Sequence, residues 1–260
     1  MQATAMQLID SHCHFDDSSF DDDREAAWRR AKDIGVNIQI VPAIKMTWWP
    51  RVKAVCDRYP GLYPAYGLHP MFMPDHEPGH LDALRQWLRQ EQPVAIGECG
   101  LDFYIPDPDR EGQQRIFEGQ LELALEFDLP VVIHARKSVE QVITTLRNYP
   151  GVTGMFHSYS GSLQQAEQLI GMGFLLSFGG PATYPGSTRL RKMIAQLPLE
   201  SILLETDSPD QPDNEHRHQR NEPAYLGNVL GAISGLLAEP PERVAEATTE
   251  NARRLFRLKP

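Results

Sequence analysis

The sequence predicts an α/β protein in which eight parallel strands and the helices between them form a single (β/α)8 TIM barrel. Short, nearly continuous apolar segments alternate with amphipathic segments of helix length along the whole chain, which is typical of parallel strands joined by helices. The apolar segments recur about every thirty residues, and a chain of 260 residues suits one such barrel. An open doubly wound sheet is the alternative, but no GxGxxG motif follows the first apolar segment.

The expected elements follow in chain order from these two patterns. The apolar segments predict strands at residues 7–10, 36–44, 62–67, 93–98, 129–135, 152–158, 174–180 and 201–207. The amphipathic segments predict helices that include residues 24–34, 81–90, 114–127, 138–148, 224–237 and 241–256. Proline and polar residues dominate residues 208–223, so we expect a long loop after the last strand.

The composition indicates an ordinary globular protein, with 41% hydrophobic and 23% charged residues. We expect one domain over residues 1–260, with residues 1–5 as a short extension before a second possible start at Met6. No apolar run approaches the ~20 residues of a membrane helix, and the N-terminus does not resemble a signal peptide. The three cysteines have no CxxC spacing, which favours a reducing compartment. We therefore expect a cytoplasmic protein without a membrane segment.

The net charge of −10 argues against a broad basic face for binding the phosphate backbone of nucleic acids. A nucleic-acid substrate stays compatible with this charge if a local attractor, such as bound metal cations, holds its phosphates.

Metal-binding side chains stand where the predicted strands end. In a barrel of this kind the chemistry lies at the C-terminal face, where the ends of all strands meet. The side chains concerned are His12 and His14 after the first strand, His69 after the third, Glu98 after the fourth, His134 after the fifth, His157 after the sixth and Asp207 after the eighth. A single histidine at a strand end is more often structural, but such a set is hard to obtain by accident. The sequence therefore predicts a metal site at the C-terminal face.

The spacing of His12 and His14 indicates how that site is built. Residues i and i+2 of a strand face the same way, so both imidazoles can bind one divalent ion while Cys13 faces the core. Glu98 and Asp207 would supply negative charge. His134 and His157 form a second pair of candidate ligands. A central carboxylate such as Glu98 could bridge two ions ~3.5–4 Å apart.

Several other side chains allow a functional or a structural interpretation. Arg136 should face the same way as His134 and is either a phosphate contact or part of a surface ion pair. Trp48 and Trp49 could stack on a base, although packing at a helix start is the favoured interpretation. The acids at 21–23 suit the N-terminus of the first helix, and we expect them to cap it. Cys99, like Cys13, alternates away from its neighbouring candidate ligand and is expected in the core. Four further histidines are expected in solvated loops: His76, His80, His216 and His218.

Several motifs together resemble those of the TatD-type deoxyribonuclease family, within the amidohydrolase-like metal-dependent hydrolases. They are, in order, "DSHCHFD", "GLHP", "IGECGLDFY", "LPVVIHAR", "FHSYSGS" and "LLETDSP" with "RNEPAYL". The resemblance covers nearly the whole chain. It implies a TIM barrel, a divalent-metal centre and phosphodiester hydrolysis. It also implies that the ligands are His12, His14, Glu98, His134, His157 and Asp207, with His69 in the site near the substrate.

This chain departs from the motifs at two positions. Asp210 stands where many relatives have an aromatic residue, and Lys137 where many have an acid. Neither is an expected ligand.

We therefore expect a hydrolase with two divalent ions (Zn, Mn or Mg) and no organic cofactor, which acts as a phosphodiesterase or deoxyribonuclease on DNA ends. DNA would be its substrate rather than a stable partner. Asp207 would orient the attacking water or accept its proton, with Glu98 between the ions. His69 or Arg136 would stabilise the phosphate or protonate the leaving oxygen.

Two alternatives stay open. The first is a small-molecule amide or ester hydrolase of the wider superfamily. Many of its binuclear members bridge their metals with a carboxylated lysine on strand four, where this chain has Glu98. The second is a non-catalytic metal-binding scaffold, in which water would not reach the metal.

Overall fold

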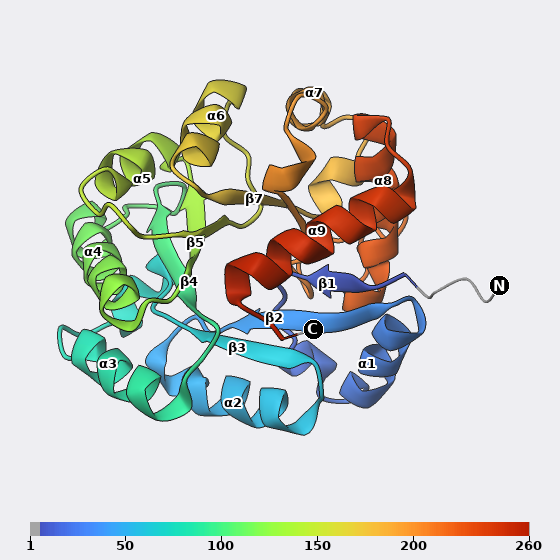
Figure 1. Cartoon of the computed structure of the whole chain (residues 1–260). Helices are drawn as coiled ribbons and strands as arrows, with labels where there is room; N and C mark the ends of the chain where they lie inside the picture. The colour runs from blue at the N-terminus through green and yellow to red at the C-terminus, as the bar shows by residue number, and fades with distance from the viewer. Residues whose placement is uncertain (1–5, 260) are drawn as a thin grey trace.

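The computed structural model describes residues 6–259, and within them eight strands form one parallel sheet (Figure 1). The strands are β1 (Leu8–Asp10), β2 (Val36–Pro42), β3 (Leu62–Tyr66), β4 (Ala95–Asp102), β5 (Val131–Arg136), β6 (Gly154–Phe156), β7 (Leu175–Phe178) and β8 (Ile202–Leu204). Their order in the sheet follows the chain, and neighbours are parallel. The amide of Ser11 donates to Leu204 O at 2.9 Å, and the amide of Asp207 donates to His12 O at 2.9 Å. These bonds bring the last strand back to the first, so the sheet is a nearly closed barrel.

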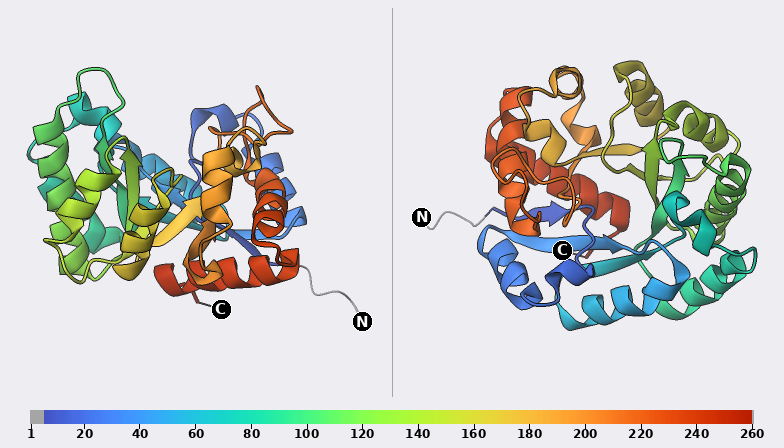
Figure 2. Two further views of the ribbon diagram at one scale, coloured as in Figure 1. Left: turned by 90° about the horizontal axis from the view of Figure 1, so that it is seen from above. Right: turned by 180° about the vertical axis from the view of Figure 1, so that it is seen from behind.

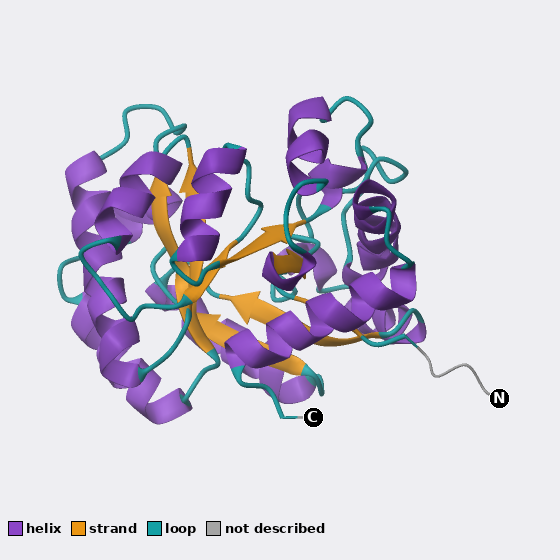
Figure 3. Ribbon diagram, turned by 45° about the horizontal axis from the view of Figure 1, so that its top comes forward, coloured by secondary structure: helices purple, strands orange, loops and turns teal. Residues whose placement is uncertain are grey.

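Helices surround the barrel on its outside (Figure 3). They are α1 (Arg24–Asp33), α2 (Trp49–Arg58), α3 (His80–Glu91), α4 (Arg110–Phe127), α5 (Val139–Leu146), α6 (Leu163–Gly171), α7 (Thr188–Ile194), α8 (Leu226–Leu237) and α9 (Pro241–Phe256). Short 3-10 helices lie between them: η1 (Ser18–Phe20), η2 (Met46–Trp48), η3 (Pro70–Asp75), η4 (Gly180–Thr183), η5 (Leu199–Ser201) and η6 (Pro223–Tyr225). The predicted (β/α)8 barrel is therefore confirmed.

Alternate residues of each strand enter two different apolar layers. In β5, Val131 and Ile133 pack outward in the layer that lies between the barrel and its helices. Val132, between them, packs inward with residues of other strands such as Ile40 and Leu203. A strand buried on both faces must be apolar throughout, which is why these segments read as continuous apolar runs.

Helix α9 closes the end of the barrel at which the strands begin. Phe256 is buried in the inner layer, and Asn251 Nδ2 donates to the carbonyls of Leu199 in η5 and Ile202 at the start of β8, at 3.0 and 2.9 Å. Figure 2 (left) shows α9 at the opposite end of the molecule from the long orange loop after β8. The C-terminal face is thus left for the functional site.

Strand β4 carries an irregularity at the centre of that site. Its register against β5 shifts between Ile96 and Cys99, so Glu98 lies in a bulge. Gly100, at φ 130°, follows the bulge, and a Cβ there would lie 2.0 Å from His134 O. Glycine therefore permits the close approach of β4 and β5 that brings Glu98 and His134 together.

Several local predictions can be compared with the structure. The loop over residues 208–223 is confirmed, since regular structure resumes only at η6. The extension at residues 1–5 lies outside the described residues. Strand β1 ends at Asp10, so His12 and His14 follow the strand rather than finish it. Within residues 6–259, no helix has the length and apolar character needed to cross a membrane.

The prediction that the acids at 21–23 cap the first helix is wrong. Asp23 precedes α1 but makes no capping bond with its side chain. Instead, Asp23 Oδ2 pairs with Arg30 at 3.0 Å, and Asp21 Oδ1 pairs with Arg24 at 2.7 Å. Nearby guanidinium groups, which make charge-assisted bonds, take these carboxylates away from the helix amides.

Candidate metal centre

The structure brings together all six side chains predicted as ligands, toward the C-terminal ends of the strands, but Glu98 lies within β4 and not after it as predicted. His12 and His14 come from the segment after β1, Glu98 from β4, His134 from β5, His157 from just after β6, and Asp207 from just after β8. His12, Glu98, His157 and Asp207 are buried, and the other two are partly buried. Cys13 and Cys99 are buried in the outer layer, as predicted.

One half of the cluster contains His12, His14 and Asp207, together with one oxygen of Glu98. Glu98 Oε2 lies 3.4 Å from the Nε2 atoms of both His12 and His14. Those two nitrogens are 3.3 Å apart, and Asp207 Oδ1 is 3.3 Å from His12 Nε2. Donor atoms that share an ion at ~2.0–2.2 Å are separated by about this much. The four donor atoms therefore fit a divalent ion.

The other half gathers around the second oxygen of Glu98. Glu98 Oε1 lies 3.1 Å from His134 Nδ1 and 2.8 Å from His157 Nε2, and these two nitrogens are 3.1 Å apart. His69 Nε2 approaches the same oxygen to 2.9 Å. The two oxygens of Glu98 thus face two separate sets of imidazoles.

Hydrogen bonds on the far side of two rings determine which nitrogen faces the cluster. His134 Nε2 donates to Asp102 Oδ2 at 2.8 Å, which turns Nδ1 toward Glu98. His14 Nδ1 donates to Pro42 O at 3.2 Å and leaves Nε2 free. Such bonds fix the tautomer and orientation of metal-binding histidines. Sequence reasoning missed Asp102, although it lies four residues after Glu98 in β4, where an even spacing indicates a shared face.

His69 is oriented differently. Its Nδ1 accepts a bond from the amide of Met71 at 3.0 Å, so Nε2 carries the proton and donates to Glu98. Burial lowers the pKa of His69 to about 4, which keeps the ring neutral. In this arrangement His69 holds Glu98 in place.

The carboxylates and imidazoles of the buried cluster affect one another's pKa values. Burial by itself would raise the pKa of Glu98, but the imidazoles of His69, His157 and His12 lower it well below its ordinary value. Burial likewise opposes ionisation of Asp207, and His12 with its neighbours lowers that pKa to about 2. Both carboxylates are therefore negative, and they attract protons or a metal cation to the imidazoles.

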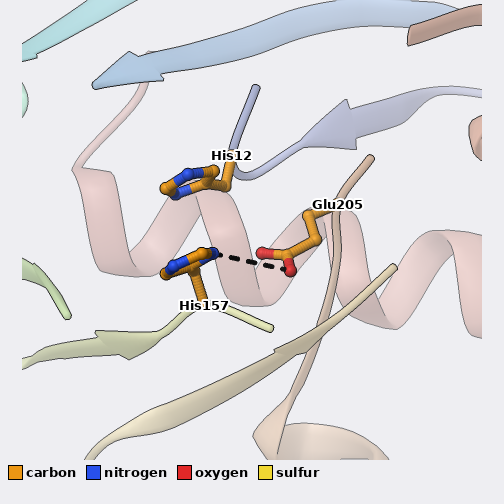
Figure 4. Close-up of side chains that lie close together, drawn as sticks. All are labelled: His12, His157 and Glu205. Carbon is orange, nitrogen blue, oxygen red and sulfur yellow. Dashed lines mark ion pairs between the residues drawn. The ribbon is translucent and has the colours of Figure 1, made fainter. Parts of the chain in front are cut away.

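Sequence reasoning also missed Glu205, a buried carboxylate behind the cluster. His12 and His157 stack with their ring centroids 4.0 Å apart, and Glu205 faces His157 from the side, with Oε1 3.9 Å from His157 Nδ1 (Figure 4). Glu205 Oε1 also accepts bonds from the amide and hydroxyl of Ser158 at 2.6 and 2.9 Å. The sequence did carry a signal for Glu205, because it is a carboxylate two residues before the predicted ligand Asp207, at the end of an apolar segment.

Polar atoms of these residues stay without partners. Within the described part of the chain, His12 Nδ1, His157 Nδ1 and Glu205 Oε2 are buried and make no hydrogen bond. A ligand atom from each of these residues lies within 4.8 Å of the others. Leaving such groups unpaired is costly, so this arrangement also fits a site that receives an ion or water.

The cluster opens into a cavity of about 700 Å³. His14, Glu98, His134, His157 and Asp207 all line it, so a substrate can reach them. The volume is ordinary for a small-molecule site. The scaffold hypothesis predicted a metal site closed to water, which this opening does not favour.

The two tryptophans have different positions. Trp49 is buried at the start of α2, where its indole donates to Gly67 O at 3.1 Å, as the packing interpretation expects. Trp48 is partly buried and lines the cavity, so its ring is placed where it could stack on a ligand.

The outer histidines also differ from one another. His218 is exposed as predicted. The prediction of a solvated ring is wrong for His76, whose Nε2 donates to His69 O at 2.9 Å, and for His216, which stacks on Tyr225 at 3.5 Å. Both rings make tertiary contacts that the composition of their loops does not predict.

Known proteins of the same kind match the chain along its length. The family model described as "TatD related DNase" matches residues 9–257. The uncharacterized metal-dependent hydrolase YjjV of Escherichia coli K12 is 41% identical over 97% of this chain and 98% of its own. A relative in Bacillus subtilis, the uncharacterized metal-dependent hydrolase YabD, is 34% identical over 96% of this chain and 99% of its own. A Danio rerio relative at 33% identity, covering 97% of this chain and 98% of its own, has a name that proposes deoxyribonuclease activity.

Solved structures agree with these relatives. The crystal structure of YjjV, a TatD homologue, has a TM-score of 0.94 at 39% identity and covers 98% of this chain and 100% of that one. A phosphotriesterase homology protein from Escherichia coli, solved with phosphate in its active site, shares the fold at 14% identity with a TM-score of 0.66, over 98% of this chain and 100% of that one. The histidine and carboxylate cluster, the barrel and these full-length matches agree, and the chain belongs to the TatD family of metal-dependent hydrolases.

Proposed function

We propose that this metal-dependent hydrolase cleaves phosphodiester bonds with two divalent ions, one on each side of Glu98. The observation that carries the proposal is the arrangement of Glu98, whose two oxygens face two separate sets of imidazoles 2.8 to 3.4 Å away. We assign His12, His14 and Asp207 to one ion, His134 and His157 to the other, and Glu98 to both. Zn, Mn and Mg are the candidate metals.

When bound, two such ions neutralise charge on a transferring phosphoryl group and activate a water molecule for attack. The phosphate would enter through the cavity that the proposed ligands line. DNA is the substrate class that the family description and the name of the Danio rerio relative suggest.

The side chains of the protein supply the remaining steps. Asp207 turns Oδ1 toward His12 and accepts a bond from Gln211 on its other oxygen. The low pKa of Asp207 keeps it ionised, so its carboxylate can accept a hydrogen bond from the attacking water and orient it; we also assign it the proton of that water. His69 holds Glu98 and lines the cavity, which keeps it a candidate contact for phosphate. Arg136 also lines the cavity and is the cationic candidate for phosphate binding.

A small-molecule ester or amide hydrolase is the second candidate function. The net charge of −10 and the acidic side chains of Asp17 and Asp210 on the cavity wall favour it, since both weaken the attraction of a long polyanion. Hydrolysis of short oligonucleotides, compared with simple phosphodiesters, carboxylic esters and amides, separates the two functions.

The test uses the protein prepared without added metal and then supplied with Mg, Mn or Zn. We expect metal-dependent shortening of a 3′-labelled single-stranded oligonucleotide, and its loss in Glu98→Ala. The matched control is Glu91→Ala, which removes an acid on α3 that pairs with Lys53 at 2.7 Å. An oligonucleotide left intact beside a hydrolysed small ester would contradict the proposal and favour the second candidate.

A further inference from the structure

The wall of the cavity carries opposite charges on opposite sides. Asp17 follows β1 and Asp210 follows β8, which is the neighbour of β1 where the barrel closes. Arg136 ends β5. In a barrel of eight strands in sequential order, β5 lies across from β1. The proposed metal ligands stand between the two sides.

The acidic side is not neutralised by the surrounding protein. Asp210 is exposed, and its carboxylate makes no hydrogen bond or ion pair with another residue of the described range 6–259. Asp17 Oδ1 accepts a bond from the amide of Ser19 at 2.8 Å, and its carboxylate forms no ion pair within residues 6–259; the nearby Arg24 guanidinium donates to the backbone carbonyl of Asp17 at 2.7 Å instead. Both charges are therefore available to act on a molecule in the cavity.

The opposite side presents cationic and aromatic groups. The Arg136 guanidinium lies 3.8 Å from the centroid of the Tyr104 ring and has no carboxylate partner among residues 6–259. A second cation, Lys45, lies on the loop after β2, next to β1, where its Nζ is 5.7 Å from the Trp48 ring and 5.2 Å from the Phe72 ring. Lys45 is paired with Asp75 at 2.7 Å, whereas Arg136 lines the cavity without a carboxylate partner in the described range 6–259.

A phosphodiester at the proposed metal ions has chain on both sides of it. Further phosphates over Arg136 would be attracted, and a phosphate next to Asp210 would meet a like charge. We propose that Asp210 is a specificity-determining residue, which disfavours substrates that carry a phosphate next to the scissile one on the β8–β1 side of the cavity. This inference rests on the proposed phosphodiesterase function.

Three dithymidine substrates test the inference: one without a terminal phosphate, one with a 5′ phosphate and one with a 3′ phosphate. Cleavage of the internal diester is followed by chromatography at pH 8 with the metal that supports turnover. We expect the wild type to disfavour one of the two phosphorylated substrates. Asp210→Asn should raise kcat/KM for that substrate by about three- to tenfold more than for the other two.

Two further observations make the result specific to charge. Asp17→Asn, which keeps an acceptor for the Ser19 amide, should act in the same direction. The gain from Asp210→Asn should shrink in 1 M salt, because screening weakens repulsion between exposed charges. The control is Asp33→Asn at the C-terminal end of α1, which removes an equal charge from the other end of the barrel and should change none of the three rates.

The outcomes separate the two claims. If Asp210→Asn changes all three values of kcat/KM by one factor, or the wild type treats both phosphorylated substrates alike, the inference is overturned while the phosphodiesterase function stands. If the wild type cleaves none of the three with any of the metals, the phosphodiesterase function and this inference both fall.

Discussion

Glu98 is the residue on which the account depends most. It is a buried carboxylate whose oxygens each approach imidazole nitrogens, and burial alone would make its charge costly. Asp207 is buried beside it and also ionised. Two such carboxylates are tolerated because positive charge on neighbouring imidazoles, or on a bound cation, offsets them.

Asp102 should control how His134 binds metal. Without the bond from His134 Nε2 to Asp102 Oδ2, the ring loses its fixed orientation. We expect Asp102→Asn to weaken binding of one ion by about 10- to 100-fold, measured by competition with a chromophoric chelator. Asp33→Asn is the charge-matched control. Unchanged affinity in Asp102→Asn would show that Asp102 does not orient His134.

Metal binding should release protons. Burial lowers the pKa of His134, but its bonds to Asp102 and Glu98 outweigh burial and raise the pKa to about 9. Burial also acts to lower the pKa of His12 and of His14, but Glu98 and Asp207 outweigh it and raise both pKa values. Below these pKa values, protons on the imidazoles compete with the metal, so affinity should increase as the pH rises from 6 toward 9.

Calorimetric titration in two buffers of different ionisation enthalpy measures the protons released. We expect at least one proton per protein at pH 7. A titration with no proton release and an affinity independent of pH would contradict the protonation states described for this cluster.

At the residue scale, the sequence predicted the proposed ligands and missed their supports. His12 and His14 could be found because their spacing places two imidazoles on one side. The even spacing of Asp102 from Glu98 and of Glu205 from Asp207 was a signal, but strand position gives only the direction of a side chain and not the residue that it contacts on another strand. The partners of His76 and His216 depend on tertiary contacts and carry no sequence signal.

At the element scale, strand β4 determines the geometry of the site. The bulge at Glu98 and the pairing of Gly100 with His134 place β4 against β5. The positions of the strands were predictable because apolar runs are, and the C-terminal ends of parallel strands meet in a barrel, although β4 continues to Asp102, beyond its predicted end at residue 98. The bulge was not predictable, since it depends on register between strands that the sequence does not specify.

Gly100→Ala should disturb fold and site together. The added methyl group would collide with His134 O, and φ 130° is unfavourable for alanine. We expect a loss of about 2–4 kcal/mol in the free energy of unfolding, measured by urea denaturation, with weaker metal binding.

The control is Gly231→Ala in the exposed middle of α8, where a Cβ meets nothing within 4 Å. This change should stabilise the protein by about 0.5–1 kcal/mol. Equal stability of Gly100→Ala and the wild type would mean that β4 and β5 can separate without cost.

At the scale of the whole molecule, apolar packing and the candidate functional site lie at opposite ends of the barrel. Helix α9 fills the end where the strands begin, and the ionisable cluster occupies the end where they finish. The loops after the strands supply the charged walls of the cavity, so substrate choice can vary while the apolar layers stay the same.

Crystals grown with Mn or Zn, with anomalous diffraction collected at the metal edge, test the central claim most directly. We predict two anomalous peaks on either side of Glu98, one among His12, His14 and Asp207 and the other beside His134 and His157. A single peak at full occupancy, or peaks that Glu98 does not contact, would contradict the assignment of Glu98 as the bridge between two ions.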